Sequence, residues 1–166
     1  MNGERCGPDG AGRAICNFGG LRFFAGPLLA LTISAPASAN NLVVNGDFEM
    51  TTNGANLQFD RLTQATGWTS TPTLTTYNFI FSSGAADIGG ATGEFGNVKL
   101  WGPGTGSNNG LTATSPAGGN FVAADSAFQV GAISQTINGL TPGQDYTVGF
   151  WWAAGQQSGF RRRNPR

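Results

Sequence analysis

The sequence contains no histidine, and charged residues occupy only 11% of its 166 positions. Without histidine, the chain can form neither a Ser–His nor a Cys–His catalytic pair, and it offers no imidazole ligand for zinc. Nine basic residues balance nine acidic ones, so the excess positive charge that binds nucleic-acid phosphates is missing. Coiled coils are rich in Glu, Lys, Arg and Leu, so the composition also argues against a long-helix protein. We therefore expect no nucleic-acid partner.

Long apolar runs are absent too. The stretch at 21–33 is mostly apolar but contains Arg22, and it falls short of the ~20 apolar residues that a membrane helix needs. It follows Arg13 and is succeeded by small residues that end in Ala-Ser-Ala at 37–39. A positive segment, an apolar segment and an A-x-A site are typical of a secretory signal peptide. We expect residues 1–39 to be a leader and the mature chain to be secreted or displayed on the cell surface.

Cleavage before Asn40 would leave a chain without thiols, since both cysteines, Cys6 and Cys16, lie in this leader. Disulfides then could not stabilise the exported protein, and an apolar core or a bound ion would have to do so. The mature chain carries six basic and seven acidic residues, and four of the basic ones fall within 161–166. No membrane span is expected in the mature chain.

The chain is instead rich in glycine, with 27 residues, and in phenylalanine, with 12. An apolar content of 39% is too high for a disordered polymer. Short runs of β-branched and aromatic residues alternate with turn dipeptides, which is typical of β-strands joined by loops. This spacing predicts an all-β, antiparallel β-sandwich. Strands are expected at 42–44, 73–81, 97–101, 121–124, 132–137 and 145–152, with long loops at 84–94 and 102–119.

The last of these runs gives the clearest pattern. Tyr146, Val148, Phe150 and Trp152 recur at every second position, so they share one face of a strand. The pattern predicts that this face is buried. We also expect the run at 132–137 to pair with it antiparallel.

Several segments together resemble a known group of proteins. They are NLVVNGDFE at 41–49, GW at 67–68, GGNFVAADS at 118–126 and ISQTINGLTPGQDYTVGFWWAA at 133–154. The chain resembles exported bacterial proteins with a galactose-binding-like jelly-roll domain, including those with a PEP-CTERM sorting signal. It is similar as well to carbohydrate-binding modules that accompany glycoside hydrolases. The resemblance implies a jelly-roll sandwich over 40–160 that binds a polysaccharide or cell-surface glycan.

The C-terminal end departs from that group. Residues 161–166 read RRRNPR, whereas the family continues through further strands. We interpret this end as a truncation or reading-frame shift that leaves the sandwich incomplete, and the other interpretation is a solvated basic tail.

Oxygen donors gather around the turn at 45–49. Asn45, Asp47 and Glu49 alternate there, and Ca²⁺ takes six to eight oxygen ligands in flexible geometry. The family resemblance implies a structural calcium ion in which the Glu49 carboxylate takes part, and the turn pattern makes Asp47 the other candidate ligand. The alternative is that both carboxylates are ordinary residues of a turn and a strand edge.

Aromatic side chains are the candidates for sugar binding, because a flat ring offers apolar area to the C–H face of a pyranose. Trp101 precedes a glycine-rich loop, and Trp151 points away from the buried face of its strand, so both are candidate platforms. Trp68 and Trp152 are expected in the core. The polar partners proposed for sugar hydroxyls are Tyr77, Gln135, Asn97 and Asp125, each of which has an ordinary surface or strand role as its alternative.

No catalytic pattern stands out. Glycoside hydrolysis needs two carboxylates on either side of the scissile bond, and nothing marks a pair among Asp87, Glu94 and Asp125. The sequence therefore favours a non-catalytic carbohydrate-binding module over an enzyme. The other hypothesis is a structural surface or matrix protein that makes protein contacts without binding sugar.

Overall fold

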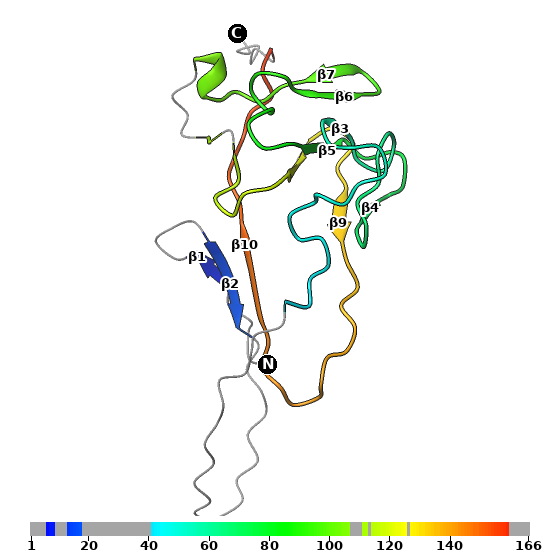
Figure 1. Cartoon of the computed structure of the whole chain (residues 1–166), viewed down its shortest axis with the longest axis vertical. Coiled ribbons are helices and arrows are strands. Elements are labelled where there is room, and N and C mark those ends of the chain that lie inside the picture. The colour runs from blue at the N-terminus through cyan, green and yellow to red at the C-terminus, as the bar shows by residue number, and fades with distance from the viewer. Residues whose placement is uncertain are drawn as a thin grey trace, which may run out of the picture. The chain divides into compact units, whose positions relative to one another are not determined.

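The computed structural model describes residues 6–8, 13–17, 41–106, 111–112, 114–125 and 127–159. Regular structure in this part of the chain is almost entirely β-strand, with one 3-10 turn at Pro103–Thr105 (Figure 1). The prediction of an all-β protein is confirmed. The apolar segment at 21–33, the Ala-Ser-Ala site and the basic end at 161–166 lie outside the described residues. Within the described residues, no helix has the length and apolar character of a membrane span.

The chain divides into two compact units. The smaller comprises Met1–Val43 and Ile137–Phe150, and the larger comprises Val44–Thr136 and Trp151–Arg166. Strands β1 (Cys6–Pro8), β2 (Arg13–Asn17) and β10 (Thr147–Trp151) form a sheet in the order β1-β2-β10. All other strands belong to the larger unit.

The larger unit is built on a five-stranded sheet with the order β7-β6-β3-β5-β8. Its strands are β3 (Leu57–Gln58), β5 (Asn78–Phe81), β6 (Ala91–Gly93), β7 (Gly96–Val98) and β8 (Phe121–Ala124). Neighbouring strands are antiparallel except β3 and β6, which are parallel. A purely antiparallel arrangement was therefore a wrong prediction. The segment 82–90 carries the chain from the end of β5 to the far edge of β3, which sets β6 parallel to β3.

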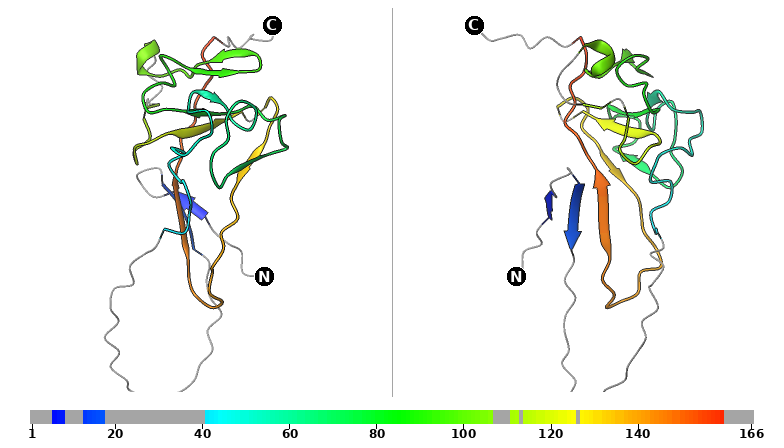
Figure 2. Two further views of the ribbon diagram at one scale, coloured as in Figure 1. Left: turned by 45° about the vertical axis from the view of Figure 1, so that its right-hand side comes forward. Right: turned by 60° about the vertical axis from the view of Figure 1, so that its left-hand side comes forward.

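A two-stranded sheet pairs β4 (Thr69–Thr71) with β9 (Ala132–Ser134), antiparallel, and both views in Figure 2 show these strands side by side. The predicted pairing of 132–137 with 145–152 is therefore wrong. Side-chain hydrogen bonds add to the backbone pairing of β9 with β4. The Thr69 and Ser134 hydroxyls lie 2.9 Å apart, and the Gln135 amide bonds to the backbone of Val44 and Gly67.

Strand β5 is the centre of the apolar core, because all four of its residues are buried. Because successive side chains of a strand point to opposite faces, Phe79 and Phe81 lie on the same face of the sheet. They pack there with Val98 and with Phe121 of β8. Ile80 faces the other way and packs with Phe59. Both faces of the central strand are thus covered by apolar side chains.

Trp68 packs against the second of these clusters. Its ring centroid lies 4.9 Å from that of Phe48, and its indole N–H donates to the Asn45 carbonyl at 2.9 Å. Trp68 was predicted in the core and is partly buried at the edge of this cluster.

The apolar face predicted for the last strand is not buried. Val148, Phe150 and Trp152 are 48%, 51% and 59% exposed, and Tyr146 is half-buried. That burial prediction was wrong because β9, the strand expected beside β10, pairs with β4.

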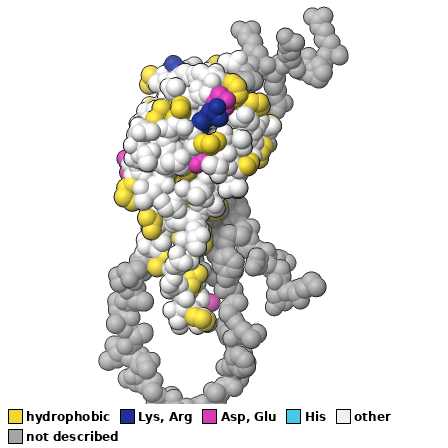
Figure 3. All heavy atoms as spheres, turned by 90° about the vertical axis from the view of Figure 1, so that its right-hand side faces the viewer, with side chains coloured by type: hydrophobic (Ala, Val, Ile, Leu, Met, Phe, Trp, Pro, Cys, Tyr) yellow, Lys and Arg dark blue, Asp and Glu magenta, His cyan; other side chains and the backbone are white. Residues whose placement is uncertain are grey.

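Charge remains sparse on the folded surface. The face in Figure 3 is mostly polar side chain and backbone, with scattered hydrophobic groups and few charged ones. Arg61 and Glu94 form an ion pair at 2.6 Å. The low charge of the sequence is therefore visible on this face of the fold.

Candidate functional site

An open cavity of about 600 Å³ lies within the larger unit, on one face of the five-stranded sheet. Its floor comes from Tyr77, which directly precedes β5, and from β5, β7 and β8 through Phe79, Val98 and Ala123. Side chains at alternate positions of a strand share one face, so the run from Tyr77 to Phe81 places two rings on the cavity side. The floor is thus an extension of the apolar core.

Aromatic rings form the rim. Phe95 lies in the turn between β6 and β7, and Phe128 lies in the loop after β8. They are 60% and 48% exposed. Their centroids lie 5.7 Å apart, and each also contacts Tyr77, at 6.2 Å and 5.2 Å respectively. The steep angles of the Phe128 contacts, 86° and 69°, are those that aromatic pairs favour.

Backbone hydrogen bonds place the Phe128 loop. The Oδ1 atom of Asp125 accepts hydrogen bonds from the backbone N–H groups of Ala127 at 2.7 Å and Phe128 at 2.9 Å. The Tyr77 N–H donates to the Gln129 carbonyl at 2.9 Å. Asp125 therefore fixes the turn that carries Phe128 and also lines the cavity itself.

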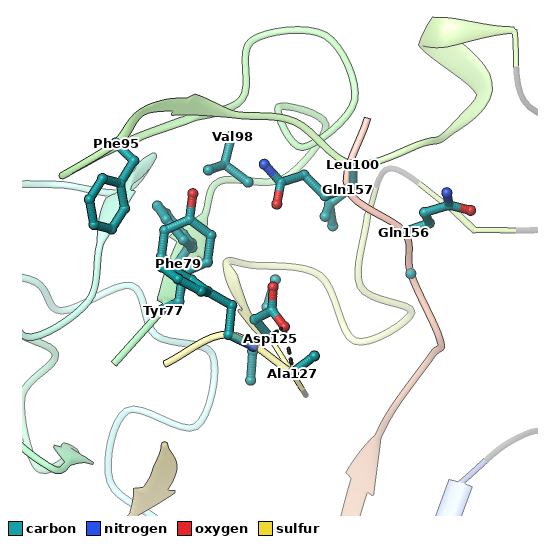
Figure 4. A pocket seen from close by; sticks show the side chains of 13 residues that line it. Tyr77, Phe79, Phe95, Val98, Leu100, Asp125, Ala127, Gln156 and Gln157 are labelled. Atoms are coloured by element: carbon teal, nitrogen blue, oxygen red, sulfur yellow. Dashed lines mark hydrogen bonds between the residues drawn. The ribbon is translucent and has the colours of Figure 1, made fainter. Parts of the chain in front are cut away.

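The opposite wall is the segment 155–157. It runs antiparallel to residues 99–101, because the Trp101 N–H donates to the Gln156 carbonyl and the Ser158 N–H donates to the Lys99 carbonyl, both at 2.7 Å. Figure 4 shows the Gln157 side chain directed toward the Tyr77 hydroxyl, with the Asp125 carboxylate on the other side of the cavity.

The polar groups of the cavity influence one another. Burial raises the pKa of the Tyr77 hydroxyl above its ordinary value, a hydrogen bond from the Gln157 side chain lowers it in part, and the negative charge of Asp125 raises it further. The hydroxyl therefore stays protonated at neutral pH. A hydroxyl, a carboxylate and amides thus surround an aromatic floor.

Two of the side chains predicted to contact sugar lie together here, Tyr77 and Asp125. Trp101 is next to the cavity-lining Leu100 but is not part of the lining, and Trp151 is 42% exposed on β10. Gln135, which directly follows β9, uses both ends of its amide to bond to Val44 and Gly67. Asn97 lies in β7, outside the lining.

Several lining residues were missed from the sequence: Phe95, Phe128, Gln156 and Gln157. The Gly-Glu-Phe-Gly turn at 93–96 could have indicated Phe95, because an aromatic side chain in a tight turn cannot easily reach the core.

The two carboxylates proposed to bind calcium lie on one side of the larger unit. A Cβ atom on Gly119 would lie 3.0 Å from Asp47 Cβ and 3.3 Å from Glu49 Oε1, so both side chains flank this glycine. The Asn45 amide instead bonds inward to Met50 and Thr66. Across the residues that the structure describes, no third acidic, cysteine or histidine side chain joins the pair.

The other two carboxylates considered for catalysis, Asp87 and Glu94, do not line the cavity and differ in their surroundings. Asp87 is buried, and its Oδ2 accepts a hydrogen bond from the Gly104 N–H at 2.6 Å. Glu94 pairs with Arg61. Among the described lining residues, Asp125 is the single carboxylate of the cavity.

Comparisons with protein-family models, with curated proteins and with solved structures found no match to this chain.

Proposed function

We propose that this chain is an exported, non-catalytic carbohydrate-binding module of the galactose-binding-like jelly-roll kind. Its ligand is a polysaccharide or cell-surface glycan, and its binding site is the cavity around Tyr77. The protein acts outside the bacterial cell or at its surface.

One observation carries the proposal: aromatic rings and hydrogen-bonding groups line the same open cavity. Tyr77, Phe95 and Phe128 offer ring surface for sugar C–H groups. The Tyr77 hydroxyl, the Asp125 carboxylate and the Gln157 amide can bond to sugar hydroxyls. A mostly apolar pocket with a few convergent polar groups is the usual form of a small-molecule site.

Binding is favoured over hydrolysis because of the carboxylate arrangement. Glycoside hydrolases commonly place two carboxyl groups about 5–10 Å apart across the scissile bond. The described cavity lining contributes Asp125 and no second carboxylate.

The second candidate function is a structural surface protein. The exposed side chains of Val148 and Phe150, two residues apart on β10, favour it, because exposed apolar groups commonly mark protein contacts.

A glycan array tests the proposal. We expect wild-type protein to bind at least one glycan, and Phe128→Ala to weaken that binding about tenfold, or ~1.4 kcal/mol, through lost stacking area. Trp151→Ala is the matched control, since Trp151 is an exposed aromatic outside the cavity lining. Equal loss in both variants would place the site elsewhere, and no binding by wild-type protein would favour the structural role.

Calcium binding by Asp47 and Glu49 is part of the same proposal, supported by their shared position beside Gly119. We expect added calcium to raise the melting temperature of wild-type protein, since a ligand at 100 times its Kd stabilises by about 2.7 kcal/mol. Glu49→Gln should abolish the shift. Glu94→Gln, the same change at the ion-paired Glu94, should keep it. A shift that survives Glu49→Gln would contradict this role.

A further inference from the structure

We propose that the cavity discriminates between glycans by charge, accepting neutral and amino sugars and rejecting those with uronate or sulfate groups. The proposal rests on the carbohydrate-binding function above and assigns its ligand class. Asp125 is the residue that sets this preference.

The first step is that the Asp125 carboxylate is held in place. Two backbone N–H groups, from Ala127 and Phe128, donate to its Oδ1 atom at 2.7 Å and 2.9 Å. Bonds from N–H groups to a carboxylate are among the stronger hydrogen bonds in proteins. The carboxylate therefore cannot swing away when a ligand enters without breaking the turn that carries Phe128.

The second step is that its negative charge acts inside the cavity. Burial is the main cause of the raised pKa of the Tyr77 hydroxyl, the hydrogen bond from Gln157 partly offsets it, and the charge of Asp125 adds a smaller upward contribution. Charges near a protein surface interact more strongly than charges in bulk water, so the carboxylate acts on groups that enter the cavity. A ligand group close to the Tyr77 hydroxyl experiences the same field.

The third step is that no described lining residue is basic. Arg61 is paired with Glu94, and Lys99 packs beside Gly90. A uronate or sulfate group in the cavity would thus meet a fixed carboxylate without a compensating cation. A sugar hydroxyl can instead donate a hydrogen bond to Asp125, and an ammonium group can pair with it.

The test is an array that carries neutral glycans beside their uronate or sulfated counterparts, for example methyl-esterified and free oligogalacturonate. We expect wild-type protein to bind neutral or amino-sugar members at least tenfold more tightly than the acidic counterparts. Asp125→Asn should reduce that difference to about threefold or less by restoring acidic binding. Asparagine keeps the acceptor oxygen that orders the turn, so the fold is preserved. Phe128→Ala should weaken both members of a pair and leave their ratio unchanged.

The outcomes separate this inference from the function on which it rests. If wild-type protein binds no glycan, the proposed function fails. If it binds acidic members as tightly as neutral ones, or if Asp125→Asn keeps the full preference, the charge inference is wrong while carbohydrate binding stands. The variant R161S/R162S/R163S is measured in parallel, since these arginines follow the cavity wall in sequence and lie outside the described residues. A preference that appears only in this variant would also overturn the inference.

Discussion

Replacing Phe81 with alanine is expected to reduce the free energy of unfolding by about 3–5 kcal/mol, the usual cost of removing a buried phenylalanine. Phe81 is fully buried in the central strand β5. Its ring stacks on Phe121 of β8 with centroids 5.6 Å apart and planes 23° apart, and it also meets Phe79 at 6.3 Å. The substitution would leave a cavity on this face of the sheet, and both neighbouring rings would lose contacts.

This loss is large against the ~5–15 kcal/mol by which small domains are stable. Urea unfolding followed by tryptophan fluorescence measures it, as a lower midpoint with an unchanged slope. Phe95→Ala is the matched control, since Phe95 is 60% exposed, and we expect it to cost less than about 1 kcal/mol. Similar losses in the two variants would show that β5 is not the centre of the core.

The strands that could be predicted are those whose sequence carries a strong local signal. Strand β8 falls on the predicted run 121–124, and β5 lies inside 73–81. The strands that the sequence did not predict are short, and their local sequence signal is weak. Strand β3 has two residues, one of them the polar Gln58, and β6 contains Gly93. Such strands form because the sheet supplies partners, which a local pattern does not report.

Pairing was harder to predict than strand formation. The turn residues at 138–143 fit a hairpin between 132–137 and 145–152, but β9 pairs with β4, more than 60 residues earlier in the chain. The deciding contacts are the Gln135 amide to Val44 and Gly67 and the Thr69–Ser134 hydroxyl pair. These are long-range hydrogen bonds that polar side chains make to the backbone or to each other, and apolar alternation contains no information about them.

The same reasoning applies to the candidate site. Tyr77 and Asp125 could be predicted as site residues because they lie in or beside strands whose sequence signal is strong. Phe128 could not, because its position depends on a turn that the Asp125 carboxylate closes. Gln157 reaches the cavity only because 156–158 pairs with 99–101, and nothing in the local sequence indicates that partner.

A second large effect is expected at Gly90, which precedes β6. Its φ is +78°, a conformation that costs a residue with a Cβ atom about 1–2 kcal/mol. A Cβ atom there would also lie 2.5 Å from the Val98 carbonyl oxygen and 2.7 Å from Lys99 Cγ. Val98 is paired with Ala91 across β6 and β7, so its carbonyl can move only if the edge of the sheet moves with it.

Gly90→Ala should therefore lower the free energy of unfolding by about 2–5 kcal/mol, the backbone cost plus about 1–3 kcal/mol for overpacking. Gly84→Ala measures the backbone cost alone, because Gly84 has nearly the same φ, +77°, and no atom within 4 Å of an added Cβ. The difference between the two variants in urea unfolding measures the close approach of Gly90 to β7. Equal losses would mean that β7 is free to shift, and hydrogen exchange at the β6–β7 amides would then show weak protection. Since Val98 also lines the cavity, the Gly90→Ala variant should lose glycan affinity as well, whereas Gly84→Ala should retain it.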